Sequence, residues 1–489
     1  MTAPSEPVAR GALTTPKIVF IVIAAAAPLA AIVGTVPLMI ARGNGAGVPG
    51  AFVLAGATLI LFALGYAAMA RHVVNTGAFY TYVAHGLGRR VSVVAALVAV
   101  IAYNAQTVGQ IGGFGFFTQL GTGGVPWWVA ALVSVAVVGV LGYRTVDVSA
   151  RVLAVLMTLE ILLLGLLDVG IVARLGTAAF PVHVLAPSTV VSAGLPIAVL
   201  FSFSCFIGFE SAALYAEETT DPRRTIPRAT YAAVVVIGLF YAFTAWLAVG
   251  AESGAGIEQL RRESSDQVGQ LYFTLMTRYV GSWASGLMGL MVLTSLIAAI
   301  LATHNASARY MFALGREGVL PRVLGGLHGR HLSPHRASLT QSAFNLLVVG
   351  LFALAGLDPY IGLASTMIGL GTLGIVALQA MAAFAVVGFF RRRDDAHWFA
   401  TRLAPGVGGV GLAVAVALTA FNFRVLSNSD SLILDALPGL YLVAAIAGIG
   451  YATWLRRNRR EVFDGIAEST FRQILVGTPD PAPGPGTAP

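Results

Sequence analysis

The sequence has few charged residues. Asp, Glu, Lys and Arg together make up 11% of the 489 residues, whereas soluble globular chains carry about 25%. So few charges cannot cover the surface of a water-soluble body of this size. Hydrophobic residues make up 57% of the chain, and the mean hydropathy is +0.81. The composition therefore excludes an ordinary soluble protein and indicates a protein embedded in a membrane.

Cysteine occurs only once. Because Cys205 has no partner cysteine, no intramolecular disulfide can form. Residues 1–16 lack the basic segment, short apolar stretch and cleavage site of a signal peptide, so we expect the first apolar run to remain as a helix. The net charge of +8 does not indicate nucleic-acid binding, because the arginines lie in loops between apolar runs.

Long apolar runs make up most of the chain. A bilayer core of roughly 30 Å requires about 20 apolar residues of helix. Twelve such runs occur, which predicts an all-α integral membrane protein with twelve transmembrane helices. The runs lie near residues 17–41, 50–70, 91–118, 126–142, 148–173, 194–214, 230–250, 282–308, 337–356, 361–390, 403–423 and 433–455.

The distribution of Lys and Arg predicts the orientation of these spans. If the N-terminus lies in the cytoplasm and the spans alternate, 24 of the 30 Lys and Arg residues fall inside and 6 outside. Cytoplasmic loops of membrane proteins carry an excess of positive charge. We therefore expect a multi-pass protein of the plasma membrane with both termini in the cytoplasm. The six outside residues are Arg42, Arg174, Arg261, Arg262, Arg278 and Arg424.

Four segments are expected along the chain. Residues 1–16 form a cytoplasmic tail, residues 17–390 form a core of helices 1–10, and residues 403–455 hold helices 11 and 12. Residues 456–489 begin with four arginines and end in a segment rich in Pro, Gly, Ala and Thr. Because such a composition cannot pack a core, a largely disordered cytoplasmic tail is predicted.

Two of the spans are interrupted. The first contains Pro28, Gly34 and Pro37, and the sixth contains Gly208 just before Glu210. Proline and glycine weaken helices, and a break at membrane depth is tolerated only where the freed backbone is buried or lines a cavity. The interrupted spans are five apart. This offset predicts an inverted repeat of helices 1–5 and 6–10, with two extra helices appended.

Four stretches, in this order, resemble the amino acid–polyamine–organocation permeases: Gly65–Met69 with Asn75–Tyr82, then Phe206–Glu210, then Ala216–Arg228 and Arg309–Pro321. The resemblance covers residues 17 to about 390. It implies the 5+5 inverted-repeat fold of sodium-coupled amino acid symporters, with broken helices 1 and 6. It also implies a secondary transporter that moves an amino acid or related amine by alternating access.

The sequence departs from these relatives at two places. Many relatives carry Gly-Ser-Gly in helix 1, whereas this chain has no such triplet between Ala30 and Gly34. Some proton-coupled relatives carry a lysine in helix 5, whereas this chain has Thr158 there, and its only lysine is Lys17. The lysine mechanism is therefore excluded.

Backbone groups at the two interruptions form the predicted substrate site. The N-terminus of a half-helix presents free N–H groups to a carboxylate, and unwound carbonyls hold an ammonium or a cation. An α-amino acid carries both groups. Proline kinks with only a packing role are the alternative. The candidates, which include two polar side chains of the third span, are Ala30, Ala31, Gly34, Tyr103, Asn104, Cys205, Phe206, Ile207 and Gly208.

Polar residues inside the spans are candidates for coupling. An intramembrane carboxylate is costly and marks a functional site by default. Glu160 and Glu210 are each either a proton or counter-charge site or a structural carboxylate, whereas Asp168 is expected at the outer interface. Thr294 and Ser295 form a candidate sodium site beside helix 1. No cofactor is expected, and coupling to H⁺, coupling to Na⁺ and substrate exchange all remain open.

Two other classes of function compete with transport. An intramembrane enzyme needs a nucleophile and a base or a metal cluster, and His304 has no second histidine at ligand spacing. A non-transporting sensor usually brings a soluble signalling domain, and no such segment is evident. The predicted partners are therefore a small amino acid or amine and the lipid bilayer. Polyamines are the alternative substrate class.

Overall fold

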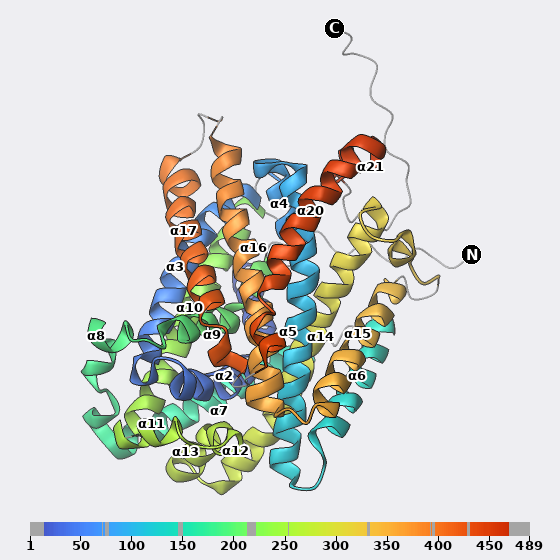
Figure 1. Cartoon of the computed structure of the whole chain (residues 1–489). Coiled ribbons are helices and arrows are strands. Elements are labelled where there is room, and N and C mark those ends of the chain that lie inside the picture. The colour runs from blue at the N-terminus through green and yellow to red at the C-terminus, as the bar shows by residue number, and fades with distance from the viewer. Residues whose placement is uncertain are drawn as a thin grey trace.

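The computed structural model describes residues 14–468 except 71, 74–77, 145–149, 213–221, 253, 330–332, 392, 394–396 and 428–430. The described residues form helices and connecting loops, without a strand. The long helices stand side by side as a bundle, and the short helices α8 and α11–α13 gather at one end of it (Figure 1).

Eleven helices of the described chain are long and apolar enough to cross a membrane, and the bent pair α1 and α2 brings the number to twelve if it forms one span. This agrees with the number expected from the sequence. The helices of the bundle are α1 (Thr15–Ala25), α2 (Pro28–Arg42), α3 (Val48–Ala70), α5 (Arg89–Thr122), α6 (Trp127–Arg144), α7 (Ala150–Leu175), α9 (Leu195–Phe206), α10 (Pro222–Ala251), α14 (Ser282–Glu317), α15 (His335–Leu354), α16 (Thr366–Phe390), α17 (Ala404–Phe421) and α20 (Gly439–Asn458).

Shorter elements connect the spans. The α-helical ones are α4 (Ala78–Leu87), α8 (Pro187–Val190), α11 (Gly254–Leu260), α12 (Ser265–Gly269), α13 (Leu271–Tyr279), α18 (Arg424–Ser427), α19 (Leu432–Asp435) and α21 (Arg460–Asp464). Two π-helical segments, Pro359–Ser365 and Phe399–Leu403, lead into α16 and α17.

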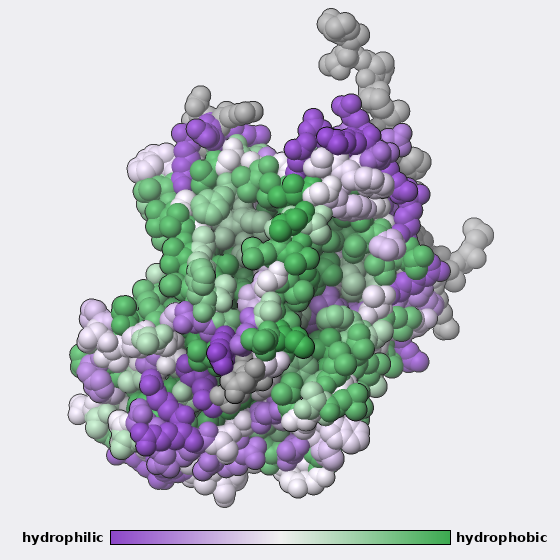
Figure 2. All heavy atoms as spheres, viewed as in Figure 1, coloured by the Kyte–Doolittle hydropathy of each residue, from purple (hydrophilic) through white to green (hydrophobic). Residues whose placement is uncertain are grey.

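The outer faces of the bundle are apolar. Leu354, Phe421, Leu442 and Ile446 are between 70% and 89% exposed. Figure 2 shows an apolar band between two more polar ends on the face in view. Soluble proteins rarely expose an apolar surface of this extent, because its contact with water is unfavourable. The band therefore suits the hydrocarbon of a bilayer.

Helix α5 forms the centre of the bundle. In its most apolar stretch 78% of the residues are buried, and it packs against α14, α16 and α20. Small residues allow the close approach to the neighbouring helices. A Cβ atom at Gly109 would lie only 2.5 Å from the backbone nitrogen of Ile368. The polar side chains of Tyr103, Asn104 and Gln106, which α5 carries, are therefore buried among the neighbouring helices.

Gly86 sets the closest approach between α4 and α16. A Cβ atom there would lie 1.9 Å from the carbonyl oxygen of Ala385, which is backbone and cannot rotate away. Gly86→Ala should therefore lower the melting temperature in detergent by several degrees, since overpacking costs about 1–3 kcal/mol. Gly350→Ala, where an added Cβ meets no atom within 4 Å, is the matched control. Equal melting temperatures of the two variants would contradict this prediction.

The chain after α20 folds back onto the bundle. The sequence predicts a largely disordered tail from residue 456, yet α20 continues past that residue and is followed by α21. Arg89 at the start of α5 pairs with Asp464 of α21 at 3.5 Å, and a second pair joins Arg89 to Glu468. These contacts hold the first part of the predicted tail in place. Residues 1–13 and 469–489 of the two predicted tails lie outside the described residues.

Candidate functional site

The first interruption lies between α1 and α2. Helix α1 ends at Ala25, helix α2 begins at Pro28, and the two axes differ by 45°. Ala27 has a left-handed backbone with φ of 46°. Proline has no N–H and disfavours a helical conformation of the residue before it, so α1 cannot continue. The break therefore precedes the three candidates of helix 1, Ala30, Ala31 and Gly34, which lie in the first two turns of α2.

The second interruption follows α9. This helix ends at Phe206, Ile207 is extended with ψ of 130°, and Gly208 has φ of +114°. Residues with a side chain rarely adopt such a φ, so the position requires glycine. Of the candidates of helix 6, Cys205 and Phe206 thus belong to the last turn of α9. Ile207 and Gly208 form the break itself.

Two side chains from other helices occupy the N-terminus of α2. The backbone N–H of Leu29 donates to Oε2 of Glu160 at 3.2 Å, and that of Ala30 donates to Oγ of Ser295 at 3.3 Å. The Ser295 hydroxyl in turn donates to the same Oε2 at 3.0 Å. Glu160 is 4% exposed and Ser295 is 1% exposed. Helices α7 and α14 thereby hold the break of the first span.

A second carboxylate lies at the other break. Oε2 of Glu210 accepts a hydrogen bond from the N–H of Gly208 at 3.0 Å, and the Tyr103 hydroxyl donates to Oε1 at 3.2 Å. The Tyr103 ring stacks on Tyr310 with centroids 5.4 Å apart. The hydroxyl of Tyr66 donates to the carbonyl of Glu210 at 3.3 Å. Tyr103, a substrate candidate from the sequence, therefore contacts a coupling candidate.

The two broken spans touch each other directly. The hydroxyl of Thr35 and the thiol of Cys205 lie 3.0 Å apart, and the thiol lies 3.8 Å from the carbonyl oxygen of Ala31. The hydroxyl of Tyr360 donates to the carbonyl of Gly34 at 3.0 Å. The structure thus brings together the candidates of helices 1 and 6. Gly34 is held by its carbonyl and Cys205 by its side chain.

Thr294 forms a hydrogen bond within its own helix, and Phe206 packs against a neighbouring helix. The hydroxyl of Thr294 donates to the carbonyl of Met291 in its own helix at 2.9 Å. The ring centroids of Phe206 and Tyr241 lie 6.3 Å apart. A Cβ atom at Gly238 would lie 3.2 Å from the Phe206 ring. Phe206 therefore packs toward α10. A role of either side chain in transport stays a prediction.

Asn104 belongs to a hydrogen-bond network between helices. Its amide donates to Ser307 at 2.7 Å, Ser307 donates to Gln341 at 2.7 Å, and Gln341 donates to Asn345 at 3.1 Å. Asn104→Ala should lower the melting temperature, because such interhelical bonds contribute about 0.6 kcal/mol on average, and it should leave the KM for substrate unchanged. A raised KM with an unchanged melting temperature would instead place Asn104 on the substrate path.

Asp168 lies at a different place from the one expected. The sequence predicts solvation at the outer interface, yet Asp168 is 5% exposed and accepts a hydrogen bond from the Thr244 hydroxyl at 2.9 Å. Helix α10 covers this turn of α7, and only the packed structure shows this. Asp168 is therefore a buried carboxylate with a partner of its own.

Sequence reasoning missed Leu29 and Tyr241. Leu29 supplies one of the N–H groups at the break, and its apolar side chain gives no signal of that role. Tyr241 is 0% exposed, and its hydroxyl has no hydrogen-bond partner among the described residues. It lies close enough to interact electrostatically with Glu160 and Cys205. A tyrosine within an apolar run does not stand out in the sequence.

The first interruption is buried, because Ala27 is 6% exposed and Ala30 is 7% exposed. Ile207 and Gly208, which form the second, are partly exposed, whereas the next residue, Phe209, is 0% exposed. A small molecule held at the buried first break can exchange with water only if helices move. The arrangement therefore suits a site that opens alternately to either side.

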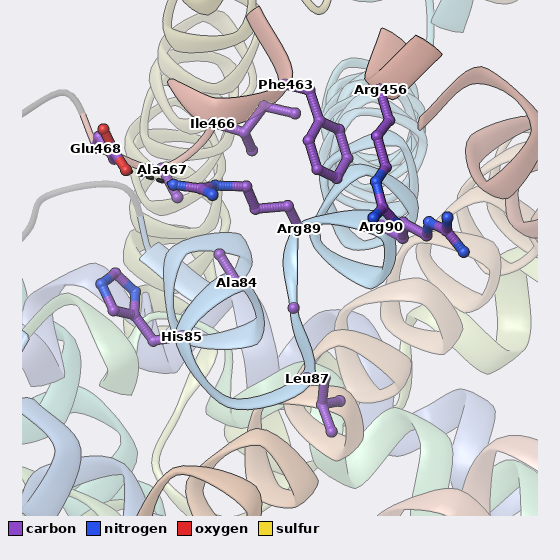
Figure 3. Close-up of a pocket in the computed structure, with 11 residues that line it drawn as sticks. Ala84, His85, Leu87, Arg89, Arg90, Arg456, Phe463, Ile466, Ala467 and Glu468 are labelled. Carbon is purple, nitrogen blue, oxygen red and sulfur yellow. Dashed lines mark hydrogen bonds and ion pairs between the residues drawn. The ribbon is translucent and has the colours of Figure 1, made fainter. Parts of the chain in front are cut away.

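A separate pocket of about 490 Å³ lies where the C-terminal segment packs on α4 and α5. Arg90 and Arg456 both line it, and Figure 3 shows Arg89 directed toward Glu468. No substrate or coupling candidate lines this pocket, so the candidate site remains at the two interruptions. The lining residues are Ala84, His85, Leu87, Gly88, Arg89, Arg90, Arg456, Phe463, Ile466, Ala467 and Glu468.

Known permeases are similar to this chain over most of its length. It is 24% identical to the low-affinity putrescine importer PlaP of Escherichia coli (strain K12) over 347 residues, which is 67% of this chain and 70% of the importer. It is 24% identical to the branched-chain amino acid permease BcaP of Bacillus subtilis (strain 168) over 387 residues, 73% of this chain and 78% of BcaP. It is 23% identical to a methylthioribose transporter of Bacillus subtilis (strain 168) over 444 residues, 82% of this chain and 90% of that transporter.

A family model that matches most of the chain shows the family. The model of the amino acid permease family matches residues 13–444, which include both interruptions and eleven of the twelve predicted spans in full. This range holds every candidate residue of the site. The chain therefore belongs to the amino acid permease family, a branch of the amino acid–polyamine–organocation superfamily.

Proposed function

We propose that this protein is a secondary active transporter that moves an amino acid or a related amine across the plasma membrane by alternating access. The observation that carries the proposal is the meeting of two helix breaks, whose spans touch at Thr35 and Cys205. Broken helices of this kind offer backbone N–H and C=O groups to a small polar solute. The names of two of the three relatives, an importer of putrescine and a permease of branched-chain amino acids, support a small nitrogen-containing substrate.

The proposal includes an inverted repeat of helices 1–5 and 6–10, with helices 11 and 12 appended. The interruptions in the first and sixth spans support it, because equivalent positions of two repeats should share such a feature. Both termini lie in the cytoplasm in this proposal. The asymmetry of 24 to 6 in Lys and Arg supports that orientation.

Coupling to protons fits the side-chain contacts better than coupling to sodium. The Ser295 hydroxyl, half of the candidate sodium site, already donates to Glu160 and accepts from Ala30. The hydroxyl of Thr294 donates within its own helix. Glu210 instead lies at a helix break that must move during transport, where its carboxylate can take up and release a proton. We therefore assign the proton to Glu210.

Uptake by reconstituted protein tests the function. Purified protein in liposomes is offered labelled amino acids and amines under a proton gradient, under a sodium gradient, or with internal substrate alone. We expect accumulation under the inward proton gradient and its loss on addition of a protonophore. Uptake that requires internal substrate would identify an exchanger. The absence of any flux from folded protein would overturn the proposal and favour a sensor.

A further inference from the structure

We propose that the substrate is a cationic amine without a carboxylate group and that Glu160 is its counter-charge. The inference rests on the proposed function, because it assigns the substrate class of the same site. The inference follows from two observations at the first helix break: which N–H groups already have acceptors, and which polar atoms remain without a partner.

The end of α2 that would bind a substrate carboxylate is occupied. Pro28 has no N–H, and the N–H groups of Leu29 and Ala30 donate to Glu160 and Ser295. The N–H of Ala31 already donates to the carbonyl of Ala27 within the helix at 3.0 Å. The positive end of the α2 dipole is therefore matched by a carboxylate of the protein itself. No N–H from Pro28 to Ala31 remains for the carboxylate of an amino acid.

The charge of Glu160 determines which ligand can lie beside it. Among the described residues Glu160 forms no ion pair, and both of its hydrogen bonds end on Oε2. A buried carboxylate without a cation is unfavourable in a bilayer. An amino acid would place a second carboxylate beside the first, and like charges repel strongly where water is excluded. An ammonium group would instead pair with the free oxygen Oε1.

The hydroxyl of Tyr241 is an independent indication of a ligand. It is fully buried without a partner in the described part of the chain, and it lies within electrostatic range of Glu160 and Cys205. A buried hydroxyl without a hydrogen-bond partner is unfavourable, so a ligand that donates a hydrogen bond to it would be stabilised there. The ring of Tyr241 contacts those of Phe52 and Phe206, with centroids 5.8 Å and 6.3 Å away. A primary amine has three N–H donors, and its cation is attracted to aromatic faces.

The test compares pairs of compounds that differ only in the carboxylate. Liposomes with the full chain are offered labelled ornithine or putrescine, and leucine or isoamylamine, in sodium-free buffer under the same gradient. We expect the amine of at least one pair to enter about tenfold faster than its amino acid. Glu160→Gln should reduce amine uptake about tenfold or more, because it removes the counter-charge. Asp168→Asn, a buried carboxylate on the same helix with its own partner Thr244, should not.

Each outcome separates this inference from the proposed function. Preferential uptake of the amino acids would overturn the inference and leave a transporter. Sodium-dependent amino acid uptake whose sodium dependence disappears in Glu160→Gln would assign the carboxylate to a sodium ion and also overturn it. Flux of neither member of any pair, without thermal stabilisation by amines, would overturn both. If Glu160→Gln does not fold, Ser295→Ala keeps the carboxylate and loses one of its donors. That variant should raise the KM for the amine and retain the preference over the amino acid.

Discussion

Gly208→Val is expected to reduce uptake about tenfold to a hundredfold while the protein still inserts into the membrane. Gly208 has φ of +114°, a conformation that a β-branched residue cannot adopt without strain of about 1–3 kcal/mol. Its N–H also holds the Glu210 carboxylate at 3.0 Å. A change of conformation at residue 208 would therefore displace both the break and the coupling candidate. Uptake in liposomes, normalised to folded protein, measures the effect.

The control for this variant is Gly88→Val. Gly88 precedes α5, has φ of +94°, and an added Cβ would meet no atom within 4 Å. It carries a similar backbone strain but lies away from both breaks. We expect both variants to lose thermal stability and only Gly208→Val to lose uptake. Normal uptake by Gly208→Val, or an equal loss in both variants, would argue against a role of this break in transport.

Glu210→Gln is expected to abolish accumulation driven by a proton gradient and to preserve exchange of substrate across the membrane. Glutamine has nearly the same shape, so its side-chain oxygen can still accept from the N–H of Gly208. It carries no ionisable proton, so a proton gradient can no longer drive accumulation of the substrate. The ratio of internal to external substrate under an inward proton gradient measures accumulation, and counterflow of labelled substrate measures exchange.

Tyr103→Phe separates the coupling role of Glu210 from a structural one. It removes the hydroxyl that donates to Oε1 and keeps the ring stacked on Tyr310. If Glu210 carries the proton, Tyr103→Phe should still accumulate substrate. If the carboxylate only holds the break in shape, Glu210→Gln keeps the acceptor for the N–H of Gly208 and should still accumulate substrate, whereas Tyr103→Phe should lower exchange and accumulation together. Full accumulation by Glu210→Gln would rule out the proton role.

The order and number of the spans could be predicted from the sequence. Hydropathy is a property of each local segment, because every transmembrane helix must be apolar over about 20 residues wherever it packs. The position of the second break could also be predicted, because Gly208 interrupts the helix through its own backbone conformation and not through a contact with a distant residue. The sequence locates the first break only to within a few residues. The sequence shows Pro28 but not that Ala27 takes the left-handed conformation before it.

The contacts of the site could not be predicted in the same way. Glu160 and Ser295 stand out as polar residues within spans, and the sequence places Ser295 beside helix 1. That Glu160 caps α2 is a contact between residues 131 positions apart, and the contact of Ser295 with Ala30 spans 265 positions. Packing of α7 and α14 against α2 determines both contacts.

The sequence by itself therefore determined the class of protein, the twelve apolar runs and the two interrupted spans, because these depend on residues that are neighbours in the chain. Only the tertiary structure decided which polar groups meet at the breaks. A backbone N–H at a broken helix donates to any suitable oxygen that packing brings within about 3 Å. Here packing brings the carboxylate of Glu160 to α2, and this contact carries the inference of a cationic substrate.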